Sequence, residues 1–175
     1  MLAYVFVVLA IAVRFMPHPW MFTPVTASLL FFGARGPRRF IWTPVVLLAA
    51  SDVVLTKFFW HYPFTWDQLV IWAWYAAVLM LGTRLRENRK PLWILGAALG
   101  SSVAFYLLSN FAVWASFNMY PKTLTGLMTC YTLALPFFQP SLLGDLLFTA
   151  GMFGVAALMG VHAEEAASSG PPAAV

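Results

Sequence analysis

The stretch PLWILGAALGSSVAFYLLSNFAVWA, residues 91–115, contains no charged side chain. An α-helix rises about 1.5 Å per residue, so about 20 apolar residues cross the hydrocarbon core of a bilayer, which is about 30 Å thick. This stretch is long enough and therefore predicts a transmembrane helix. The next question is whether the rest of the chain is built for lipid as well.

The composition of the whole chain extends this prediction. Of its 175 residues, 62% are hydrophobic, 17% aromatic and 9% charged, and the mean hydropathy is +0.81. A soluble domain of this size has too little interior to bury so much apolar surface, so we expect an all-α integral membrane protein. We predict a single polytopic membrane domain over residues 1–162. The small and polar residues 163–175 predict a disordered cytoplasmic tail.

Six apolar segments predict about six transmembrane helices. They are residues 1–16, 23–34, 40–59, 68–82, 91–115 and 141–160. A further apolar stretch, residues 123–135, is too short to cross, so we expect a short re-entrant or interfacial helix there. The first segment resembles the core of a signal peptide. No basic residues precede it, however, so we expect it to be retained as a helix.

The basic residues predict the orientation of the chain. Seven of the ten Lys and Arg residues lie in two connections, ARGPRR at 34–39 and TRLRENRK at 83–90. By the positive-inside rule both connections are cytoplasmic, and six crossings then place both termini in the cytoplasm, as in a multi-pass protein of the inner membrane. Basic residues confined to short connections do not predict a nucleic-acid partner. The single cysteine, Cys130, excludes an intrachain disulfide.

The three other connections have a different composition. Residues 14–24, 57–67 and 118–126 are rich in aromatic residues, proline and histidine. An aromatic belt at the lipid headgroups accounts for part of this pattern, because Trp and Tyr favour that layer. A binding site on the outer side of the membrane accounts for the prolines and the nearby polar residues as well.

Four polar residues interrupt the apolar segments at a similar predicted depth, namely Arg14, Asp52, Asn110 and Asp145. A charge at the centre of a membrane helix costs about 2.5–3.5 kcal/mol on insertion scales, so such residues usually have a partner or a function. One interpretation is an ion pair, Arg14 with Asp52 or Lys57 with Asp145, that only fixes helix packing. The other is a polar pocket with aromatic walls, open to the outside.

The pocket interpretation names a set of ligand-binding residues. In it, Asn110 is the floor, and Trp114, Asn118 and Tyr120 are the wall and rim. The full set is Arg14, His18, Asp52, Asn110, Trp114, Asn118, Tyr120 and Asp145. No spacing motif predicts a metal site, a nucleotide site or a catalytic group, so we expect no cofactor and no enzyme activity.

Pairs of small residues four apart predict close helix contacts. Gly96 and Gly100 form such a pair in the fifth segment, and Ala150 and Gly154 form another in the sixth.

Three blocks of sequence resemble an uncharacterised family of small prokaryotic membrane proteins. They are RFMPHPWMFTPVTASLLFFGA at 14–34, SNFAVWASFNMYPKTLTGL at 109–127 and LPFFQPSLLGDLLFT at 135–149. No activity is assigned to that family, so this resemblance implies a fold and no function.

The layout also resembles the substrate-binding S components of energy-coupling-factor (ECF) vitamin transporters. TPVTASLLFFGARGPRR at 23–39 and LLAASDVVL at 47–55 are similar to the second and third helices of that group. The resemblance implies a six-helix bundle that binds a vitamin or a vitamin precursor from outside. It further implies a membrane scaffold subunit with cytoplasmic ATPases as partners, besides membrane lipid. One alternative is a structural or assembly protein of the cell envelope without a small-molecule ligand. Another is a membrane enzyme that acts on a lipid-linked substrate with Asp52 or Asp145 as general base, which no spacing motif specifically supports.

Overall fold

The computed structural model describes residues 1–16, 22–87 and 90–168. Within these residues the chain is all-α. The helices are α1 (Leu2–Arg14), α2 (Val25–Arg35), α3 (Thr43–Val54), α4 (Asp67–Arg84), α5 (Pro91–Ser116) and α6 (Leu124–Ser168). A 3-10 turn, η1 (Arg38–Phe40), precedes α3, and a π-helical segment, η2 (Leu55–Phe59), continues it. The all-α prediction is therefore confirmed.

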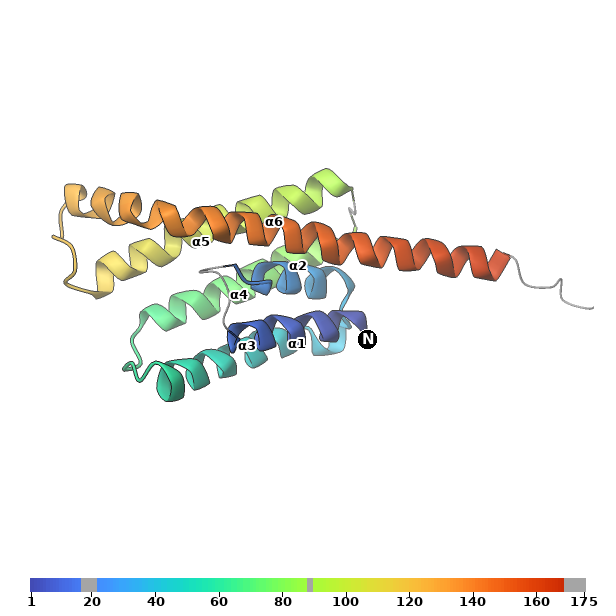
Figure 1. Cartoon of the computed structure of the whole chain (residues 1–175), viewed down its shortest axis with the longest axis horizontal. Coiled ribbons are helices and arrows are strands. Elements are labelled where there is room, and N and C mark those ends of the chain that lie inside the picture. Colours follow the sequence, from blue (N-terminus) through green and yellow to red (C-terminus); the bar gives the residue numbers. More distant parts are fainter. Residues whose placement is uncertain (17–21, 88–89, 169–175) are drawn as a thin grey trace, which may run out of the picture.

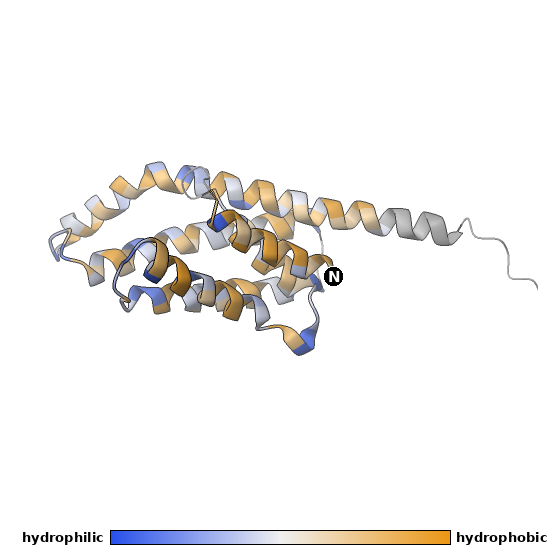
Figure 2. Ribbon diagram, turned by 60° about the horizontal axis from the view of Figure 1, so that its bottom comes forward, coloured by the Kyte–Doolittle hydropathy of each residue, from blue (hydrophilic) through white to orange (hydrophobic). Residues whose placement is uncertain are grey.

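Three helical stretches of the described residues are long and apolar enough to cross a membrane. They are Arg38–Phe59, Pro91–Ser116 and Leu124–Gly160. The helices α1 and α2 are also apolar but have only 13 and 11 residues. Hydrophobic residues predominate along the helices, and many of the hydrophilic ones lie near the connections (Figure 2). These features suggest a membrane protein.

Successive helices alternate in direction (Figure 1). As a result, the N-terminus, the end of α6, the connection from α2 to α3 and the connection from α4 to α5 all lie at one end of the bundle. We call this the basic end, because the two connections hold the arginine clusters. The connections lie close together: burial lowers the pKa of Arg86, and the positive charge of Arg38 lowers it further.

Helix α2 is the centre of the bundle. It packs against all five other α-helices, and every residue from Val25 to Ala34 is buried. Close approach to α4 depends on Gly33 and Gly82, since a Cβ atom on Gly33 would lie 2.4 Å from the carbonyl oxygen of Leu79. At the basic end, Arg86 donates hydrogen bonds of 2.7 Å to the carbonyl oxygens of Gly33 and Gly36, which satisfies the last turn of α2.

Helix α6 runs without a break through Pro136 and Pro140. The prediction of a separate short helix at residues 123–135 is therefore wrong, because this stretch is the first part of α6. A proline removes one hydrogen bond of the helix, yet membrane helices tolerate it where neighbouring groups satisfy the freed backbone. With 45 residues, α6 is about 67 Å long, twice the hydrocarbon thickness.

The ends of α6 extend beyond the rest of the bundle (Figure 1). The domain boundary predicted at residue 162 falls within this helix, which reaches Ser168. Residues 169–175 of the predicted tail lie outside the described residues.

The small residues predicted to form close helix contacts do not form them in the described bundle. A Cβ atom added to Gly96, Gly100 or Gly154 would have no described neighbour within 4 Å, and Ala150 is exposed. The tight glycine contact of the described bundle joins α2 and α4 instead. A four-residue spacing specifies a helix face, and it leaves open whether that face meets another helix or lipid.

Candidate functional site

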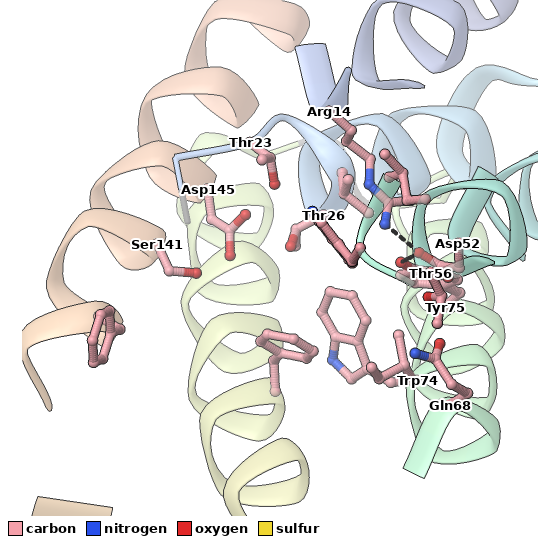
Figure 3. Close-up of a pocket in the computed structure, with 16 residues that line it drawn as sticks. Arg14, Thr23, Thr26, Asp52, Thr56, Gln68, Trp74, Tyr75, Ser141 and Asp145 are labelled. Carbon is pink, nitrogen blue, oxygen red and sulfur yellow. Dashed lines mark hydrogen bonds and ion pairs between the residues drawn. The ribbon is translucent and has the colours of Figure 1, made fainter. Parts of the chain in front are cut away.

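A cavity of about 460 Å³ lies at the end of the bundle opposite the basic end (Figure 3). It is formed where α1 ends, α2 begins and α3 passes into η2, with α4, α5 and α6 completing the wall. The lining residues are Arg14, Thr23, Val25, Thr26, Asp52, Leu55, Thr56, Trp60, Gln68, Ile71, Trp74, Tyr75, Phe105, Phe137, Ser141 and Asp145. Three of the predicted site residues, Arg14, Asp52 and Asp145, therefore come together.

One side of the cavity holds an ion pair with a complete set of partners. Arg14 on α1 pairs with Asp52 on α3, and it also donates a 2.8 Å hydrogen bond to the Ser51 hydroxyl. The indole of Trp72 on α4 donates to the other carboxylate oxygen of Asp52 at 3.0 Å, and the Tyr75 hydroxyl lies 3.4 Å from the first. The predicted Arg14–Asp52 pair is thus confirmed, and it ties three helices together.

The other side of the cavity holds Asp145, which is only 5% exposed. Ser102 on α5 donates a 2.6 Å hydrogen bond to its carboxylate. Among the described residues it forms no ion pair. The alternative pair with Lys57 is not formed, since that side chain is exposed. Figure 3 shows Asp145 and Thr26 facing each other across the cavity.

The start of α2 contributes to this second side. Among the described residues no side chain caps this helix, whose N-terminus lies next to the cavity. The first N–H groups of a helix lack partners within it and carry a partial positive charge. A carboxylate at this position is favoured, which fits the place of Asp145.

Aromatic rings form much of the remaining wall. The rings of Trp74 on α4 and Phe105 on α5 are in contact, with their centroids 4.6 Å apart and their planes tilted by 45°. The indole N–H of Trp74 is buried and has no hydrogen-bond partner within the described residues. A buried donor without an acceptor is costly.

The sequence held a signal for the α6 side of the cavity. Phe137, Ser141 and Asp145 follow one another at intervals of four residues, so one helix places all three on one face. We missed Phe137 and Ser141 because the prolines suggested that the helix begins only after Pro140. Because α6 continues through both prolines, the four-residue pattern crosses a position where the sequence predicted a helix boundary.

The α3 side of the cavity depends on a feature that the sequence does not reveal. Leu55 and Thr56 line the cavity from η2, where the helix has π geometry. Such segments add a residue to one turn and often occur at functional sites. Just beyond it, His61 has a positive φ of 56°, which turns the chain toward α4.

Four predicted site residues lie outside the cavity lining, namely Asn110, Trp114, Asn118 and Tyr120. Asn110 donates instead to the carbonyl oxygen of Tyr106 in its own helix, at 2.8 Å. The structure therefore does not make Asn110 the cavity floor. His18, the eighth predicted residue, lies outside the described residues.

The segment after Asn110 closes the hairpin between α5 and α6. Trp114 donates a 2.9 Å hydrogen bond to the carbonyl oxygen of Pro121. The Lys122 ammonium group bonds the carbonyl oxygens of Trp114 and Phe117, and it lies 5.4 Å from the Trp114 ring. A lysine on the last carbonyls of a helix is a common cap. These residues therefore end α5 in the present structure.

The described residues contain no group of three His, Cys, Asp or Glu side chains able to hold a metal ion. The described cavity wall presents the carboxylate of Asp145, several hydroxyl groups and aromatic faces.

Comparison with known proteins places the chain in a family. No curated protein and no solved structure gives a significant match. The resemblance to ECF S components is therefore not supported by a relative. A family model matches residues 1–168, nearly the whole chain, which confirms the predicted uncharacterised family. The chain belongs to the family of unknown function DUF6580.

Proposed function

We propose that this protein is a membrane-embedded component that binds a small organic solute, such as a vitamin or its precursor, from outside for uptake. The observation that carries the proposal is the cavity, at about 460 Å³. Small-molecule sites are typically 300–1,000 Å³, with mostly apolar walls and a few placed polar groups. Aromatic rings from α4 and α5 and the carboxylate of Asp145 fit this description.

The charge distribution supports an outward-facing site. The two arginine-rich connections lie at the basic end, which the positive-inside rule assigns to the cytoplasm. The cavity is formed by the opposite ends of the helices and would then face outward. In this proposal all six helices cross or enter the inner membrane, and both termini are cytoplasmic.

Cysteine labelling in intact cells tests this orientation. In a Cys130→Ser background, a cysteine at the exposed Arg38 of the basic end should resist an impermeant thiol reagent, and one at the exposed Asn118 should react. Labelling in the opposite sense refutes an outward-facing cavity.

A structural role in the cell envelope is the second candidate. The Arg14–Asp52 group favours it, because the Arg14 guanidinium and both carboxylate oxygens of Asp52 bond to other parts of the protein. Asp145 and the Trp74 N–H do not fit that role, since each is buried without an equivalent partner among the described residues. We therefore assign packing to the first side of the cavity and binding to the second.

Mass spectrometry of the purified protein tests the binding proposal. The chain is purified in mild detergent, and small molecules released on denaturation are compared among variants. Wild type should carry a solute that is lost in Ser141→Trp, which fills the cavity, and retained in Glu87→Gln, an exposed site at the basic end. A solute level in Ser141→Trp equal to wild type, in a variant that melts normally, favours the structural role. Copurification of an ATPase complex would add support for uptake.

A further inference from the structure

We infer that the solute is an organic monocation whose ammonium or protonated ring nitrogen pairs with Asp145. The inference rests on the proposed function and narrows the class of ligand. Its starting point is the charge of the cavity wall.

The described lining residues carry one positive and two negative groups, namely Arg14, Asp52 and Asp145. Arg14 and Asp52 form an ion pair and cancel each other. The described part of the wall is left with one negative charge, that of Asp145. An uncompensated buried charge is unfavourable in a low-dielectric site, so an occupant of charge +1 restores the balance.

The groups around Asp145 orient its carboxylate. Ser102 donates a hydrogen bond of 2.6 Å, and the N-terminus of α2 adds partial positive charge. These groups are neutral, so they orient the carboxylate without cancelling its formal charge. They also restrict it to one position on the cavity wall (Figure 3), as recognition of a charged group requires.

The aromatic wall also suits a cation. Trp74 and Phe105 both line the cavity, and a cation within about 6 Å of a ring centroid is attracted by the ring face. An anionic solute finds no free cation on the described wall, since the guanidinium of Arg14 is bound to Asp52 and Ser51.

Three sets of probes of similar shape and different charge test the inference. The cations are benzylamine, 2-phenylethylamine and 3-phenylpropylamine, the neutral probe is 2-phenylethanol, and the anion is 3-phenylpropanoate. Binding to the purified full-length protein is measured by calorimetry and by the shift of the melting temperature at neutral pH. At least one amine should bind tenfold or more tightly than the alcohol, and the carboxylate should not bind.

The variants separate the carboxylate from general effects. Asp145→Asn keeps the shape and removes the charge, so the amine should lose its tenfold advantage over the alcohol. Glu87→Gln makes the same chemical change at an exposed position of the basic end and should keep that advantage.

The remaining outcomes distinguish this inference from the proposed function. Equal binding of amine and alcohol to wild type overturns the inference and still supports a solute site. Failure of every amine to bind also overturns it, while the copurified solute remains the test of binding as such. Selectivity for amines that appears only in His18→Gln overturns it too, because Asp145 would then have an internal cationic partner.

Discussion

The two sides of the cavity solve the problem of a buried carboxylate in different ways. Asp52 has an arginine, an indole and a phenol within the protein. Asp145 has the Ser102 hydroxyl and the start of a helix, and no cation among the described residues. Both are buried acids at a similar level of one bundle, so burial and depth do not distinguish packing from binding. The balance of charge within hydrogen-bonding distance does.

The largest effect on stability is expected at the Arg14–Asp52 ion pair, where the two charges balance each other. Arg14→Met should lower the free energy of unfolding by about 3–5 kcal/mol, because it leaves the Asp52 carboxylate buried without its cation. The double variant Arg14→Met/Asp52→Leu should regain most of this loss, since it removes both charges. Unfolding in detergent, followed by circular dichroism against increasing denaturant, measures both. Equal loss in the single and double variants would mean that the pair does not hold α1 to α3.

The Arg14–Asp52 pair shows what the sequence could predict. Arg14 and Asp52 carry opposite charges at a similar predicted depth, in the first and third apolar segments. Of the two ion pairs that the sequence offered as an alternative to a pocket, this one is formed. The alternation of charged and aromatic connections also predicted which connections lie at the same end of the bundle as the N-terminus (Figure 1). These predictions needed only depth along each helix.

Asn110 shows what depth alone leaves out. Phe105 lines the cavity from the same helix, and at 100° per residue five residues place Asn110 about 140° around α5 from it. Its side chain therefore bonds its own backbone, away from the cavity. Angular position around the helix axis needs one residue known to face the site, which a single sequence did not provide.

The second prediction removes the hydrogen bond that Trp72 donates to Asp52. Trp72→Phe keeps an aromatic ring and deletes the 3.0 Å hydrogen bond to Asp52. A hydrogen bond to a charged group contributes about 1.5–3 kcal/mol, so the variant should be destabilised by about that amount. The copurified solute should be unchanged, because Trp72 does not line the cavity. Loss of solute without loss of stability would show that Asp52 contributes to solute binding and not to helix packing.

The third prediction concerns Asp145, where removal of the charge should not lower the stability of the protein. Asp145→Asn retains an oxygen that accepts from Ser102 and removes a buried charge that has no described counter-ion. In protein stripped of solute, this variant should unfold at the wild-type denaturant midpoint or above it. It should nevertheless lose the solute. A fall of about 3 kcal/mol, as expected for Arg14→Met, would show that Asp145 is paired within the protein after all.

The smallest effect is expected at Asn110, which tests whether the boundary of the site is drawn correctly. Asn110→Leu deletes a hydrogen bond to the backbone of the same helix and changes the side-chain volume little. Hydrogen bonds between membrane helices average about 0.6 kcal/mol, and this one joins no second helix, so stability should change by less than about that amount. The variant should also keep its full complement of solute, because the side chain lies outside the cavity lining. Melting temperature and solute content from the same preparation, with Ser141→Trp as the positive control, measure both properties. Loss of solute in Asn110→Leu at unchanged stability would extend the site along α5 toward Trp114. The cavity seen between the six helices would then be only its inner part.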